Sequence, residues 1–175
     1  MTRQIKHTRL CIDSLLYPKK LAAYRILSIG KVIQYTFLLI TLITAFSFGQ
    51  FIAGNPSTYF SGELASFAQD LQFLIYIIGA VFLFAMNTAV IFAKVSIYAY
   101  VGLLFSKVMK RRAEYRQLWR TTAFAITWEV LLSIILPVFS LPAAVPLIIM
   151  GAVTLSFVFV ALTKFPKLPA ASIAK

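Results

Sequence analysis

The stretch Lys107–Arg120, KVMKRRAEYRQLWR, separates two long apolar runs and carries six of the seventeen lysines and arginines of the chain. A single acidic residue, Glu114, lies among these cations. Cytoplasmic loops of multi-span membrane proteins collect Lys and Arg in this way. The stretch therefore predicts a polytopic membrane protein with this segment on the inner side of the membrane.

Composition favours the same class of protein. The 175 residues are 61% hydrophobic and 13% charged, and the mean hydropathy is +0.87. A soluble domain is typically about 45–50% apolar. The net charge of +12 lies beside apolar runs, which favours anionic lipid headgroups over nucleic acid as the partner. With Cys11 as its one cysteine, the chain can form neither an internal disulfide nor a thiolate metal cluster.

The first 31 residues predict helices that lie in the membrane interface. They hold seven cations and one acid, Asp13, and apolar residues recur at helical spacing before Pro18. We expect Pro18 to end this first helix and begin a second, which would stop at Gly30. The region 1–31 is accordingly predicted to be cytoplasmic.

The remaining apolar runs predict an all-α bundle of about four transmembrane spans. A run of roughly 20 apolar residues crosses a hydrocarbon core about 30 Å thick. The segment 53–70 holds two acids and no cation, so we expect it outside, and both termini inside. The bundle covers residues 32–163, with a cytoplasmic tail at 164–175 and spans near 32–52, 71–106, 121–140 and 147–163.

The run 71–106 is too long for a simple span. As one helix it would extend about 54 Å. Two crossings would place the basic stretch outside and would leave a second piece too short to cross. We therefore expect one tilted or bent crossing with an extra helical piece at an interface.

No catalytic, cofactor-binding or metal-binding motif is present in the sequence. It contains no HExxH, P-loop, GxSxG or GxGxxG pattern, and its five acids lie far apart. An enzyme is therefore the least favoured class, and no cofactor is predicted.

Basic residues near the ends of the apolar runs are candidates for contacts with lipid headgroups. Attraction to anionic lipid is one interpretation of them, and a solvated loop that only sets topology is the alternative. Ala85, Ala89 and Ala93 recur at four-residue spacing and predict close packing by a neighbouring helix. The headgroup candidates are Lys19, Lys20, Arg25, Lys110, Arg111, Arg112 and Arg116.

Lys94 and Glu129 are ionisable side chains inside apolar runs, where a charge is costly and usually faces a partner or water. One interpretation is an ion pair that joins the second and third spans. The other is a proton or substrate site in the middle of the membrane.

Two blocks resemble a known family: YPKKLAAYRILSIGKVIQYTFLL (17–39) and YVGLLFSKVMKRRAEYRQLWRTTAFAIT (100–127). They are similar to a bacterial family of uncharacterised membrane proteins, often labelled maltodextrin-utilisation proteins, which are similar in outline to Yip-type membrane proteins. The family generally has a longer external segment than 53–70 between its first two spans. The resemblance implies a bacterial plasma membrane and a link to sugar uptake, without an established activity.

Two hypotheses about function follow. The first is a non-enzymatic accessory or scaffold subunit that binds another membrane protein or a second copy of itself. The second is a small carrier or lipid-handling protein that uses Lys94 and Glu129.

Overall fold

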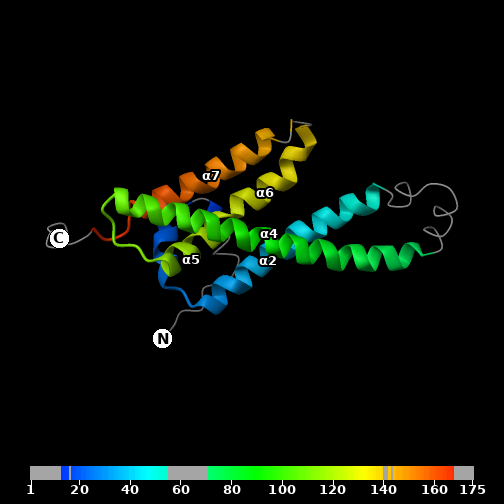
Figure 1. Cartoon of the computed structure of the whole chain (residues 1–175), viewed down its shortest axis with the longest axis horizontal. Coiled ribbons are helices and arrows are strands. Elements are labelled where there is room, and N and C mark those ends of the chain that lie inside the picture. The colour runs from blue at the N-terminus through cyan, green and yellow to red at the C-terminus, as the bar shows by residue number, and fades with distance from the viewer. Residues whose placement is uncertain (1–12, 16, 55–70, 140–141, 143, 168–175) are drawn as a thin grey trace. The chain divides into compact units, whose positions relative to one another are not determined.

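The computed structural model describes residues 13–15, 17–54, 71–139, 142 and 144–167. Within these ranges every regular element is a helix (Figure 1). Among the described residues, four helical segments are long and apolar enough to cross a membrane, which confirms the predicted all-helical architecture with four spans. In chain order the elements are η1 (Pro18–Ile26), α2 (Ile29–Ala53), α4 (Gln72–Val108), α5 (Tyr115–Ala125), α6 (Thr127–Ile135), η3 (Leu136–Phe139) and α7 (Ala144–Leu162).

The N-terminal region differs from the expectation at one residue. The 3-10 helix η1 begins at Pro18, where proline's missing N–H costs no hydrogen bond. It ends at Ile26, because Leu27 is extended with ψ 150°. Helix α2 then begins at Ile29, so the prediction that Gly30 stops a helix is wrong. The predicted interfacial helix before Pro18 lies mostly outside the described residues.

The second span is one unbroken helix of 37 residues, about 56 Å long. The extra helical piece expected at an interface is therefore part of α4 itself. The helix ends where Lys110 adopts a left-handed conformation with φ 52°. The amide of Lys110 donates to the Lys107 carbonyl at 3.1 Å and that of Arg111 donates to the Ser106 carbonyl at 2.8 Å. This pair of bonds is a Schellman motif with lysine where glycine is usual.

The third span begins earlier than expected and contains a break. It starts at Tyr115 rather than at residue 121, and it divides at Ile126 into α5 and α6. The hydroxyl of Thr127 donates to the Phe124 carbonyl at 2.6 Å beside the break. The second half of the basic stretch is thus helical, and the connection from α4 to α5 is short. The fourth span, α7, starts at Ala144 and includes Pro146 in its first turn.

The helices form two compact units, Met1–Thr36 with Ala93–Lys175, and Phe37–Phe92. In the second unit, segments of α2 and α4 pack through aromatic side chains. A Cβ at Gly79 would meet the ring of Phe51 at 2.7 Å, so the ring would have to shift if this position carried a side chain. The amide of Asn87 donates to the Thr44 hydroxyl at 3.1 Å and adds a polar link between the two helices.

The core of the first unit is built around α5 and α6. In an apolar 18-residue stretch of the candidate span Tyr115–Ile135, 56% of the residues are buried, against 6% in such a stretch of α4. The centre of the Phe124 ring lies 5.0 Å from the centre of the Tyr24 ring and 4.8 Å from that of the Tyr35 ring. The buried hydroxyl of Tyr35 is hydrogen-bonded to Thr127 at 2.8 Å. The third span is therefore packed against η1 and α2, and these contacts lie on both sides of its break at Ile126.

Candidate functional site

Two places in the first unit gather the residues that the sequence singled out. The first is the pair of intramembrane charges. Lys94 Nζ, on α4, lies 2.6 Å from Glu129 Oε1, on α6. The Glu129 side chain is 5% exposed and the Lys94 side chain 32% exposed. The structure thus brings together the two charges that were expected to pair or to form a site.

Two further residues, which the sequence did not indicate, complete the surroundings of Glu129. The hydroxyl of Thr154, on α7, donates to Glu129 Oε2 at 3.2 Å. The hydroxyl of Tyr98 lies near the same carboxyl group. Tyr98 lies four residues after Lys94, on the same helical face, which is the signal that could have found it. Thr154 stands in an apolar run without a distinguishing pattern.

The break at Ile126 explains how a carboxylate is tolerated here. It places Glu129 in the first turn of α6, where the helix dipole favours a negative charge. A buried carboxylate without partners would be strongly unfavourable, but this one has an ammonium group and two hydroxyl groups around it. The pair therefore links α4, α6 and α7 into one polar junction.

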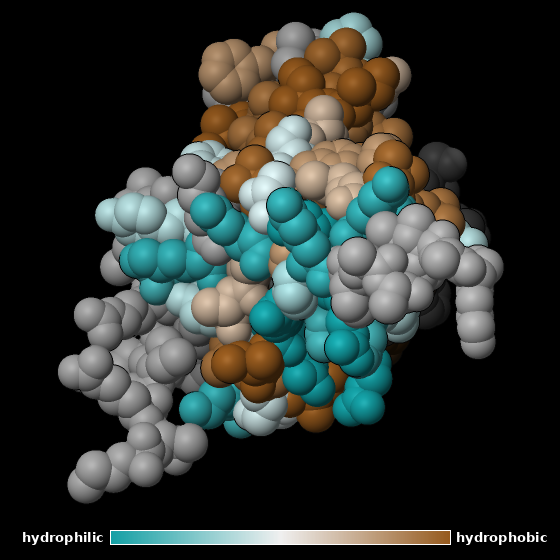
Figure 2. All heavy atoms as spheres, turned by 90° about the vertical axis from the view of Figure 1, so that its left-hand side faces the viewer, coloured by the Kyte–Doolittle hydropathy of each residue, from teal (hydrophilic) through white to brown (hydrophobic). Residues whose placement is uncertain are grey.

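The second place is the basic end of the unit, where the connection between α4 and α5 meets the segment after α7. Arg111 Nη1 donates to the Phe165 carbonyl at 2.8 Å, and the amide of Arg112 donates to the Pro166 carbonyl at 2.8 Å. Arg111 and Lys167 also form an isolated antiparallel bridge. In Figure 2, hydrophilic residues gather on the end where α4 and α7 finish.

The basic residues of η1 are held in different ways. The guanidinium of Arg25 lies 4.9 Å from the centre of the Phe165 ring. The Arg25 carbonyl accepts a hydrogen bond from Arg120 Nη1 at 3.1 Å. Lys20 is engaged in an ion pair with Asp13 at 3.0 Å and lies over the ring of Tyr17. Lys19 belongs to η1, but its side chain is outside what the structure describes.

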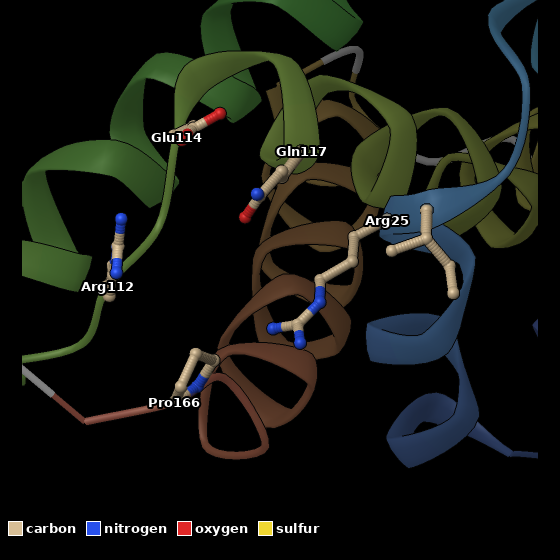
Figure 3. Close-up of a pocket in the computed structure, with 6 residues that line it drawn as sticks. Arg25, Arg112, Glu114, Gln117 and Pro166 are labelled. Carbon is tan, nitrogen blue, oxygen red and sulfur yellow. The ribbon is translucent and has the colours of Figure 1, made fainter.

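A hollow of about 270 Å³ brings two of the headgroup candidates together (Figure 3). Arg25 and Arg112 lie on opposite sides of it, with the side chain of Gln117 between them. Arg116 instead lines a separate hollow of about 220 Å³ with Ile29, Tyr115 and Trp119. The first hollow is lined by Arg25, Ile26, Arg112, Glu114, Gln117 and Pro166.

The predicted packing stripe lies open in the described structure. Ala85, Ala89 and Ala93 are all exposed, so packing of a neighbouring helix on them stays a prediction. Among the described residues, no group of three His, Cys, Asp or Glu side chains could hold a metal ion.

Comparison with known proteins gives a family without an assigned activity. A search of curated proteins and a search of solved structures returned no match. A family model described as "Protein of unknown function (DUF1189)" matches residues 57–163, which is more than half of the chain. The matched region contains α4 to α7, and with them Lys94, Glu129, Arg112 and Gln117. The chain therefore belongs to the uncharacterised family DUF1189.

Proposed function

We propose that this protein is a non-enzymatic accessory or scaffold subunit that binds another membrane protein in a bacterial plasma membrane, with both of its termini in the cytoplasm. The observation that carries the proposal is that the charges of the Lys94–Glu129 pair already have partners within this chain. A carrier needs an ionisable group that can exchange its partner for a proton or solute. Both oxygens of Glu129 are already engaged by side chains of this chain.

The surface of α4 supports binding of a partner within the membrane. In an apolar 18-residue stretch of this helix 6% of the residues are buried within the chain, and Ala85 and Ala89 lie exposed on α4. Small residues at four-residue spacing let a second helix approach closely, which is how helices associate where lipid removes the hydrophobic driving force. The partner is another membrane protein or a second copy of this chain.

The resemblance of residues 17–39 and 100–127 to proteins labelled for maltodextrin utilisation supports a sugar transporter as that partner. The basic end of the first unit supports contact with anionic lipid at the inner surface. Neither link requires catalysis by this chain.

One observation favours the carrier or lipid-handling alternative. The Lys94 side chain is 32% exposed, so a solute could reach the pair from that side. Purification from native membranes separates the two functions. A stoichiometric protein partner that is lost on Ala89→Leu and kept on Val90→Leu supports the accessory role, because Val90 is also exposed and apolar but lies outside the alanine stripe. Retained solute without a protein partner supports the carrier.

A further inference from the structure

The residues that line the hollow between Arg25 and Arg112 all lie near the ends of helices in the first unit. Arg25 and Ile26 end η1 just before α2 begins, and Arg112 and Glu114 lie between α4 and α5. Gln117 is in the first turn of α5, and Pro166 follows α7. Every lining residue therefore stands just beyond, or in the first turn of, an apolar span. This is the depth at which lipid headgroups lie.

Both arginines have their backbone held in place without any ligand, and the guanidinium of Arg25 is held as well, whereas the side chain of Arg112 is exposed. The backbone of Arg112 is fixed by its bond to the Pro166 carbonyl. Arg25 is fixed by the ring of Phe165 and by the bond from Arg120 to its carbonyl. Phe165 is itself buried, with 1% exposure, so its ring is a rigid support. Groups that are already ordered lose less entropy when they bind a ligand.

The chemistry of the lining suits a phosphate group. Guanidinium groups present paired N–H donors that match phosphate oxygens. The amide of Gln117 is a further donor, and the N-terminus of α5, an 11-residue helix, adds a positive dipole. About 15 Å³ suffices for one water, so a hollow of about 270 Å³ has room for a phosphate and the group attached to it.

We propose that this hollow binds the phosphate of a phosphate ester between Arg25 and Arg112. The ester is either the headgroup of an anionic phospholipid or a soluble phosphorylated compound. Ile26, 79% exposed at the rim, offers an apolar contact beside the charged lining. Among the described residues that line the hollow, Glu114 is the one acid, and with the two arginines it leaves a single net positive charge.

Binding by the full-length protein in neutral detergent tests the proposal, with native mass spectrometry as the readout. The probes are phosphatidylglycerol, phosphatidylcholine and inorganic phosphate. We expect phosphatidylglycerol to be retained as one copy, and Arg25→Gln and Arg112→Gln each to weaken its binding by about tenfold. Lys164→Gln removes the same charge from an exposed site outside the hollow, and its affinity should stay within about twofold of the wild type.

The Glu114→Gln variant distinguishes an effect on binding from a loss of folding. This change removes the negative charge from the lining, so it should tighten binding several-fold, which a misfolded protein cannot do. Displacement of the lipid by inorganic phosphate would assign the site to soluble phosphate compounds, and retention of the lipid would assign it to headgroups. Equal retention of phosphatidylcholine, or arginine variants that behave like Lys164→Gln, would overturn the proposal.

Discussion

Removing Lys94 should destabilise the protein more than removing the charge of Glu129. In Lys94→Met the buried carboxyl group of Glu129, with 5% of its side chain exposed, loses its ammonium partner. Breaking one side of a buried ion pair costs about 3–5 kcal/mol. The bond from Thr154 remains, so we expect a loss at the low end, about 3 kcal/mol.

The opposite change leaves a better-solvated charge. In Glu129→Gln the ammonium of Lys94, 32% exposed, can turn toward water or headgroups through its long side chain. The glutamine amide also keeps an oxygen that can accept the bond from Thr154. We expect a loss of about 1–2 kcal/mol. The double variant leaves no charge unmatched, so its loss should fall short of the sum of the single losses by about 2 kcal/mol.

Thermal unfolding in detergent measures all four proteins. For a chain of this size 1 kcal/mol shifts the Tm by about 2–4 °C, so Lys94→Met should lower it by about 6–12 °C. Lys164→Gln, at an exposed lysine, is the control and should leave the Tm nearly unchanged. Losses that add to within about 0.5 kcal/mol would refute the reasoning, because they would mean that the two side chains do not interact.

Three other expectations concern topology, packing and the end of α4. In a variant without Cys11, an impermeant thiol reagent added to intact cells should label cysteine at position 57 but not at position 113; equal labelling would exclude the four-span topology. Gly102→Leu should lower the stability by about 1–3 kcal/mol, since even a Cβ at this position would lie 3.1 Å from the Val158 side chain. A Cβ at Gly30 would meet no atom within 4 Å, so Gly30→Ala should be neutral or stabilising. Equal Tm values for the two variants would contradict this packing. Lys110→Gly should stabilise by about 1 kcal/mol because φ 52° strains a side chain, and an unchanged or lower Tm would argue against that strain.

The number of spans and the contact between Lys94 and Glu129 could be anticipated because both depend on hydrophobicity and charge. Apolar runs must become helices where lipid offers no hydrogen bonds. The break at Ile126 could not be anticipated from hydrophobicity and charge alone. Beside it, the Thr127 hydroxyl donates to the Phe124 carbonyl and is hydrogen-bonded to Tyr35. The helical start at Tyr115 was missed for a different reason.

That start was missed because charge in the basic stretch predicted a loop. Arg116 and Arg120 are also good helix formers, and the helix buries Leu118 while its arginines lie at the end of the span. The hollow could not be predicted from the sequence for another reason. It joins Arg25 to Arg112 and Pro166 through contacts between distant parts of the chain, which no local pattern encodes.

The burial of the third span has a consequence for biogenesis. Of the four candidate spans, Tyr115–Ile135 has the lowest hydropathy and the largest buried share. Such a segment partitions weakly into lipid by itself, because charged residues oppose insertion. Its partners Tyr35 and Lys94 lie on spans that leave the ribosome earlier, so they are available to receive it. We therefore expect insertion of this protein to be cooperative, with the first two spans receiving the third and α7, which carries Thr154, completing the polar junction last.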